Sequence, residues 1–254
     1  MGFGLDSLAQ LPFWASQLAE VVILASVAFG AGILATRYGV LVNYTRKIGH
    51  FAAFLVPVFV TDLFPFQPTP ATTLTSGAIL LGLLALLSKP LRSRSAFLMT
   101  IFRSFDRPED RPYTLLWLTT QLVAGYAVII TFGVVFSRME MLRLIYIPIL
   151  VSGIGDGLAE PVGVRFGRRK YQVPAIFSSR TYERTLEGSA CVFVTSVIVI
   201  LFFQSAFTTP QLWTALAAVP LLLTFAEARA PHTWDQPFLL FAGYVSLLAI
   251  KIWV

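Results

Sequence analysis

The chain alternates long apolar segments with short polar ones. Several segments approach the roughly 20 residues that a helix needs to cross lipid, although the second, third, sixth and seventh are shorter. Backbone groups in lipid must be satisfied within the segment, and the strict alternation of a β-barrel is absent, so we expect helices. The eight segments run approximately over Ala15–Thr36, Ile48–Phe64, Ala71–Leu87, Leu115–Phe136, Leu144–Val162, Gly188–Gln204, Leu212–Ala228 and Pro237–Val254.

This pattern predicts an all-α polytopic membrane protein with about eight transmembrane helices (seven to nine) in one domain, residues 1–254. The proline-rich run Phe64–Pro70 predicts a turn between the second and third segments. The apolar stretch Ala96–Phe102 lies within the mixed region Lys89–Pro112, and we expect it to form a short helix at the membrane interface.

Composition agrees with a membrane protein. Of the 254 residues, 56% are hydrophobic and only 13% are charged, and the mean hydropathy is +0.75. A soluble domain has about 25% charged residues.

The single cysteine, Cys191, excludes an internal disulfide and a cysteine-based zinc site. The first charges, Asp6 and Glu20, do not fit the basic start of a cleavable signal peptide.

The basic residues are distributed unevenly between the predicted loops. Of the 19 lysines and arginines, the loops after even-numbered segments and the C-terminus hold only Arg138, Arg143 and Lys251. Cytoplasmic loops are enriched in basic residues. We therefore expect the loops after odd-numbered segments to be cytoplasmic and both termini to lie outside.

Two carboxylates occur in a segment that should be apolar. Asp156 and Glu160 lie near the end of the fifth segment, four residues apart and therefore on one helix face. A charge at the centre of a membrane helix costs about 2.5–3.5 kcal/mol, so buried acids usually line a functional site. Paired oxygen ligands suit Mg²⁺.

Other polar residues are expected at the same cytoplasmic rim. Carboxylates that hold a metal ion, together with basic groups that neutralise phosphate, support phosphate chemistry. This set comprises Arg46, Lys47 and His50 at the start of the second segment, Glu187 before the sixth, Glu227 at the end of the seventh and Asp235 before the eighth.

Two features allow alternative interpretations. The basic run Arg165–Lys170 could face a nucleotide or anionic headgroups, or could simply set topology. The glycines between Gly153 and Gly167 could permit close helix packing or let backbone N–H groups approach phosphates. We favour packing for Gly153 and site architecture for Gly155 and Gly157.

Four motifs resemble those of the CTP-dependent polyprenol kinases, the phytol, farnesol and dolichol kinases. They are Arg46-Lys47-Ile48-Gly49-His50; the run from Gly155 through Asp156, Ala159 and Gly163 to Gly167; Arg184-Thr185-Leu186-Glu187-Gly188-Ser189; and Glu227 with Trp234-Asp235-Gln236. They occur in the family's order over residues 43–240. Gln236 stands where the family commonly has asparagine. Arg180, instead of Arg184, could also align with the basic position of the third motif.

The resemblance implies a membrane kinase that transfers the γ-phosphate of CTP, or another nucleoside triphosphate, to an isoprenoid alcohol such as phytol, farnesol or dolichol. It implies Mg²⁺ (or Mn²⁺) held by Asp156, Glu160 and Glu187, with His50 as a further catalytic residue. Contacts to the nucleotide and its phosphates are implied for Arg46, Lys47, Gly155, Gly157, Gly163, Gly167, Arg184 and Ser189. Membrane lipids are the expected surroundings, and no nucleic-acid partner is expected.

Three other functions remain open. The related CDP-diacylglycerol synthases share part of the second and third motifs, and a cytidylyltransferase is the nearest rival. Their later His-Gly-Gly and Lys-Asp elements are absent after Ser189. A transporter could use intramembrane acids to relay ions, but these acids gather at one face and no repeat is visible. A structural membrane subunit would leave the acids unexplained.

Overall fold

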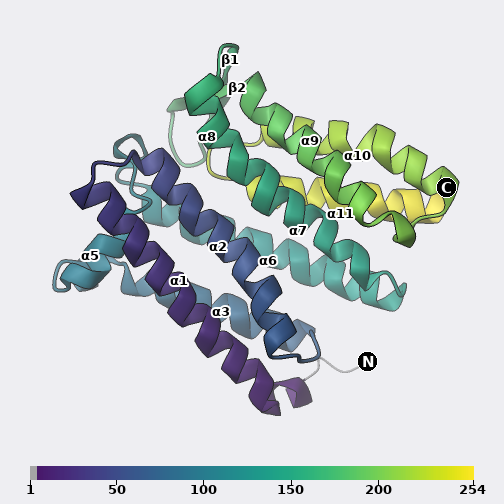
Figure 1. Cartoon of the computed structure of the whole chain (residues 1–254), viewed down its shortest axis with the longest axis horizontal. Helices are drawn as coiled ribbons and strands as arrows, with labels where there is room; N and C mark the ends of the chain where they lie inside the picture. Colours follow the sequence, from purple (N-terminus) through teal and green to yellow (C-terminus); the bar gives the residue numbers. More distant parts are fainter. Residues whose placement is uncertain (1–4) are drawn as a thin grey trace. The chain divides into compact units, whose positions relative to one another are not determined.

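The structure is a computed structural model in which residues 5–254 are described, and it is almost entirely helical (Figure 1). Each of the eight predicted apolar segments lies on a helix. The helices are α1 (Leu11–Arg37), α2 (Val42–Leu63), α3 (Pro70–Leu86), α4 (Lys89–Arg92), α5 (Ala96–Arg103), α6 (Thr114–Arg138), α7 (Tyr146–Leu150), α8 (Gly157–Phe166), α9 (Leu186–Phe202), α10 (Thr209–Arg229) and α11 (Asp235–Trp253). Short 3₁₀ turns occupy Leu5–Ala9, Pro108–Asp110, Leu142–Ile145 and Gln204–Ala206.

Within the described residues, five helices are long and apolar enough to cross a membrane. They are α1, α6, the continuous helical run Leu142–Phe166, α10 and α11. Helices α3 and α9 are apolar but shorter, and α2, which contains Arg46, Lys47 and His50, is not among the five. These helices indicate a multi-pass membrane protein, whereas eight crossings and the orientation of the termini stay predictions.

Local sequence explains several helix ends. Thr69 and Thr208 each accept a hydrogen bond from the third backbone N–H of the helix that follows, and a proline occupies the first turn. The predicted turn before α3 is confirmed, because residues 65–69 contain no helix. Ala96–Phe102 is helical in α5, although its position at an interface stays a prediction.

The chain divides into two compact units, residues up to Tyr126 and residues from Ala127. In unit 1, α1 packs against α2 and α5. A Cβ at Gly32 would lie 2.0 Å from the carbonyl oxygen of Thr100, so glycine permits this close approach. The loop before α6 is fastened by ion pairs between Arg107 and Asp110 (2.8 Å) and between Arg111 and Asp106 (2.7 Å).

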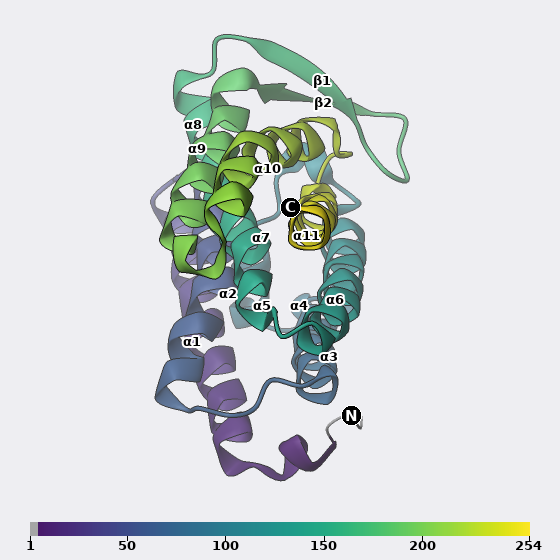
Figure 2. The ribbon, with the colours of Figure 1, turned by 90° about the vertical axis from the view of Figure 1, so that its right-hand side faces the viewer.

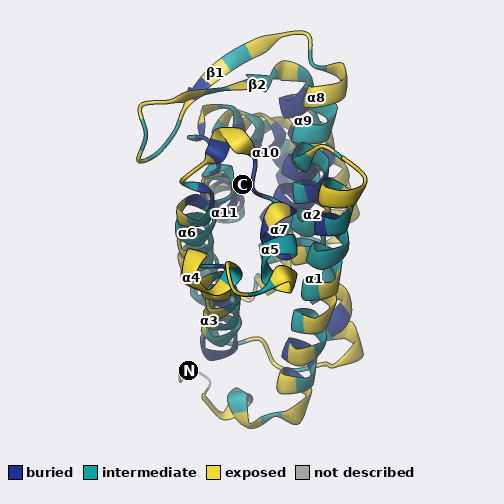
Figure 3. Ribbon diagram, turned by 90° about the vertical axis from the view of Figure 1, so that its left-hand side faces the viewer, coloured by how far each residue is buried: buried dark blue, intermediate teal, exposed yellow. Residues whose placement is uncertain are grey.

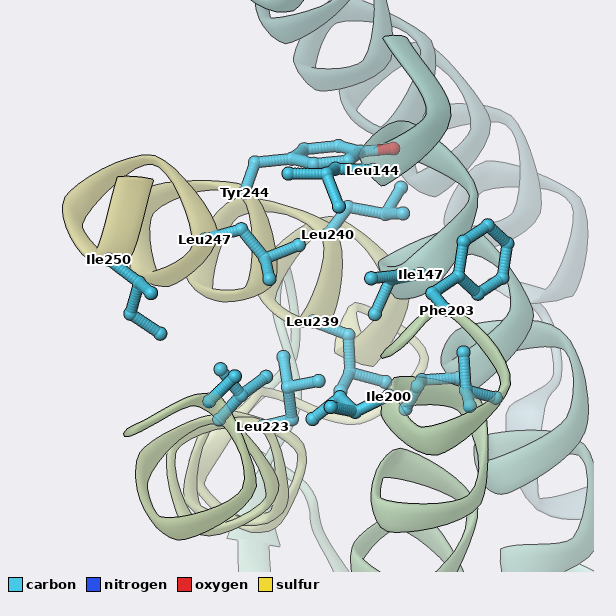
Figure 4. Packing of buried hydrophobic residues seen from close by; sticks show 14 of the residues in the cluster. Leu144, Ile147, Ile200, Phe203, Leu223, Leu239, Leu240, Tyr244, Leu247 and Ile250 are labelled. Carbon is cyan, nitrogen blue, oxygen red and sulfur yellow. The ribbon is translucent and has the colours of Figure 1, made fainter. Parts of the chain in front are cut away.

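Unit 2 has an apolar core between α7, α9, α10 and α11 (Figure 4). Fully buried leucines at positions 223, 239, 240 and 247 meet Ile147 and Ile200. Tyr244 carries the hydroxyl seen in Figure 4, and this hydroxyl donates a hydrogen bond to the carbonyl oxygen of Ile145 at 3.1 Å. The core therefore packs four helices of unit 2 against one another.

A short antiparallel hairpin departs from the all-α expectation. Strands β1 (Lys170–Pro174) and β2 (Thr181–Thr185) pair with Tyr171 opposite Arg184 and Val173 opposite Tyr182. The hairpin begins beside the ends of α8 and α9 and extends over α10 (Figure 2). Its connection to α9 is immediate, because Thr185 ends β2 and caps α9 by accepting from the N–H of Gly188 at 3.1 Å.

Candidate functional site

The hairpin has one inward face and one outward face, as the two-residue period of a strand requires. Tyr171, Val173, Tyr182 and Arg184 share the face that is wholly or partly buried, whereas the alternate positions are mostly exposed (Figure 3). The exposed face carries an ion pair between Lys170 and Glu183 at 2.9 Å. The inward face delivers Tyr171 and Arg184 to a polar cluster among the helices.

Arg184 is the centre of this cluster. Its Nη1 donates to Glu227 Oε1 at 3.1 Å and also to the backbone carbonyl of Glu227. Its Nη2 donates to Asp235 Oδ2 at 3.4 Å and to the carbonyl of Pro231 at 3.5 Å. The side chain is only 12% exposed. Arg184 thus joins the hairpin to the end of α10 and the start of α11.

Ser189 extends the cluster to α9. Its hydroxyl donates to Glu227 Oε2 at 2.6 Å, and because a hydroxyl has one proton, it must accept from the Tyr171 hydroxyl at 2.7 Å. Both oxygens of the Glu227 carboxylate therefore have donors. We call the set of Tyr171, Arg184, Ser189, Glu227 and Asp235 the Arg184 network.

Asp156 borders this network. Its side chain is buried at 5% exposure, and its charge acts on both Arg184 and Glu227. Burial opposes the charge of Arg184, but the carboxylates of Asp235, Glu227 and Asp156 outweigh burial and raise the pKa of its guanidinium. Arg184 is therefore a permanent cation that compensates acids from three other elements, two of them buried.

The phenol of Tyr171 responds to the same surroundings. Burial first, and the Glu227 carboxylate second, raise the pKa of Tyr171 above its usual value. Tyr171 therefore stays protonated and remains a donor to Ser189 at neutral pH.

Asp156 ends a π-helical turn, Val151–Asp156, which interrupts the fifth predicted segment. Such turns are rare and often mark functional sites. The turn lies close to α9, because a Cβ at Gly155 would be 3.0 Å from Cα of Val192. Gly155 thus permits close packing against α9, and its role in site architecture stays a prediction.

Two further glycines of the same motif are explained by packing against the start of α9. A Cβ at Gly163 would lie 2.7 Å from Thr185 Oγ1, and one at Gly167 would lie 2.4 Å from Thr185 Cγ2. Contacts of Gly163 and Gly167 with phosphate, like the site role assigned to Gly157, stay predictions.

The three carboxylates expected to share a metal ion do not form one group. Glu160 lies half-buried in α8 and Glu187 lies in the first turn of α9, where its carboxylate accepts from the Arg169 N–H at 3.3 and 3.4 Å. Within residues 5–254, no three His, Cys, Asp or Glu side chains are grouped so that they could hold a metal ion. Mg²⁺ bound to a nucleotide needs only one or two carboxylates, because phosphates and waters supply the other ligands. Binding of Mg²⁺ by Asp156 and Glu160 therefore stays a prediction.

Arg46, Lys47 and His50 belong to unit 1, near the start of α2. Lys47 is buried, and the His50 ring lies 4.9 Å from the Phe54 ring. The expectation that these residues share a pocket with the acids of unit 2 stays a prediction.

Sequence reasoning missed three residues of the site region. The sequence patterns assign no role to Tyr171, Tyr182 or His232. The rings of Tyr182 and His232 stack at 3.5 Å between centroids, and the His232 N–H donates to Pro174 O at 2.8 Å. The alternation of Tyr171 with Val173 and of Tyr182 with Arg184 is a strand signal that could have revealed the hairpin.

Searches of protein-family models, curated proteins and solved structures gave no match to this chain.

Proposed function

We propose that the protein is a membrane-embedded kinase that transfers the γ-phosphate of CTP, or a related nucleotide, to an isoprenoid alcohol. The observation that supports a site is the convergence of Asp156, Arg184, Ser189, Glu227 and Asp235 from separate elements of unit 2. The reaction class follows from the four motifs that resemble those of polyprenol kinases.

In this proposal, the Arg184 network holds Asp156 in position. Phosphoryl transfer requires mainly positioning and neutralisation of charge. Mg²⁺, held by Asp156 and by the phosphates, would supply charge neutralisation there. Arg184 has protein partners at both terminal nitrogens, so we assign it the positioning of Glu227 and Asp235 instead of a direct phosphate contact.

The alcohol needs a proton acceptor, because a neutral hydroxyl is a weak nucleophile. We assign this role to Glu160, which lies one helical turn beyond Asp156 and is partly accessible. The alcohol oxygen bonds to the γ-phosphorus, the bond to the β-phosphate oxygen breaks, and CDP leaves while the proton passes to the carboxylate. The isoprenoid chain would remain among the apolar helices.

Isotope labelling tests the reaction class. The purified protein is incubated with CTP labelled at the γ- or α-phosphate, together with farnesol, phytol or phosphatidate. We expect γ-label in a prenyl phosphate. Transfer of α-label into a CDP-lipid would instead identify a cytidylyltransferase, and absence of transfer from both labels would contradict the kinase proposal.

A further inference from the structure

An open pocket of about 490 Å³ lies beside the end of α8. It is lined by Arg165, Phe166, Gly167, Arg168 and Glu187. Arg165 and Arg168 are exposed, and no carboxylate among the described residues lies within ion-pair distance of either guanidinium. Guanidinium groups are well suited to phosphate because they donate paired, charge-assisted hydrogen bonds.

The wall of this pocket also holds a carboxylate of the chain itself. Glu187 accepts from the Arg169 N–H through both oxygens, at 3.3 and 3.4 Å, and the Arg168 backbone also faces it. Successive backbone N–H groups that point the same way form concave sites for anions. Glu187 therefore occupies the place where the oxygens of an external anion would be bound.

The backbone of this site is held in place by its surroundings. The Gly167 N–H donates to Gly163 O at 3.0 Å, and the Leu186 N–H donates to Arg169 O at 3.0 Å. A Cβ at Gly167 would come within 2.3 Å of Gly163 O, so the chain can follow this path only with glycine there. The anion-binding groups are thus fixed before any ligand arrives.

We propose that this pocket is a phosphate-binding site whose backbone donors are occupied by the Glu187 carboxylate until a phosphate group displaces it. The phosphate belongs either to a soluble nucleotide or to the headgroup of an anionic lipid, since both present the same oxygens. This assignment does not depend on the kinase proposal, because it concerns binding without turnover.

Two substitutions should change phosphate affinity in opposite directions. Glu187→Gln removes the competing charge but retains an oxygen that can accept from the Arg169 N–H, so binding should tighten roughly three- to tenfold. Arg168→Gln removes a charge-assisted donor and should weaken binding roughly tenfold. Lys170→Gln is the matched control, because Lys170 is adjacent and exposed but already paired with Glu183.

The two sources of phosphate are distinguished by two measurements on the full chain. In neutral detergent, calorimetry measures the binding of inorganic triphosphate. In nanodiscs of phosphatidylcholine with or without phosphatidate, native mass spectrometry measures the phosphatidate retained. The opposed changes should appear with triphosphate if the ligand is a nucleotide and with phosphatidate if it is a headgroup.

Three outcomes would overturn the proposal. One is unchanged binding in both measurements for Glu187→Gln and Arg168→Gln. Another is an equal loss for Lys170→Gln and Arg168→Gln, which would show attraction to charge in general. The third is weaker binding after Glu187→Gln, since that would make Glu187 a ligand-binding group instead of a competitor.

Discussion

Removing the guanidinium of Arg184 should destabilise unit 2 strongly. Its side chain is 12% exposed, and its partners Glu227 and Asp235 are 4% and 17% exposed. Deleting one partner of a buried ion pair costs about 3–5 kcal/mol, because a charge is left without compensation. Arg184→Met keeps most of the side-chain volume, so the loss should come from the two uncompensated carboxylates.

A double-mutant cycle tests whether the loss of stability in Arg184→Met comes from the uncompensated carboxylates. Glu227→Gln in the Arg184→Met background removes one of the orphaned charges, so the double variant should be more stable than the sum of the single effects by about 1–3 kcal/mol. The free energy of unfolding is measured by titrating SDS into dodecyl maltoside micelles, with circular dichroism as the signal.

Lys170→Met provides the control on the same hairpin. Lys170 and Glu183 form an ion pair whose side chains are 60% and 55% exposed. Exposed pairs contribute about 0–1 kcal/mol, so this substitution should have little effect. An Arg184→Met loss no larger than that of Lys170→Met, together with additive effects in the cycle, would refute the view that the Arg184 network stabilises the site.

Three further predictions concern catalysis, packing and ionisation. Asp156→Asn should lower the rate of phosphate transfer at least about 100-fold, because loss of one charge-stabilising group in an active site has an effect of that size. Asp62→Asn, at an exposed position of α2, is the control and should leave the rate unchanged. Equal rates for both variants would remove Asp156 from the mechanism. Gly188→Ala should destabilise the protein by about 1–3 kcal/mol in the same SDS titration, because the Cβ of the new alanine would lie 2.6 Å from a backbone oxygen of α8. Gly49→Ala is the control: its Cβ would meet nothing within 4 Å, so this substitution should be neutral or slightly stabilising. The raised pKa of Tyr171 means that folding favours the neutral phenol. The stability that this contributes is therefore complete at pH values below the pKa of tyrosine in the unfolded chain, near 10, and is lost as the pH rises through the pKa of Tyr171 in the folded protein. Ultraviolet titration of wild type minus Tyr171→Phe should therefore show tyrosinate only above pH 10, and tyrosinate appearing earlier would contradict the burial of this phenol.

Sequence pattern alone located the helices. Segments such as Leu115–Phe136 and Leu212–Ala228 coincide with α6 and α10 to within a few residues, because long apolar runs and capping residues act locally. The same reasoning selected Asp156, Glu227 and Asp235, since charged groups next to apolar helices are conspicuous wherever they occur.

Only the tertiary structure decided which of these groups meet. Arg184 contacts Glu227 and Asp235, which lie 43 and 51 residues away along the chain, whereas Glu187, three residues from Arg184, faces the Arg169 backbone instead. A pattern of apolar and polar positions specifies the faces of single elements, but the pairing of side chains depends on the register of the hairpin and on how α9, α10 and α11 pack. Both are set by contacts between distant segments, which local periodicity does not encode.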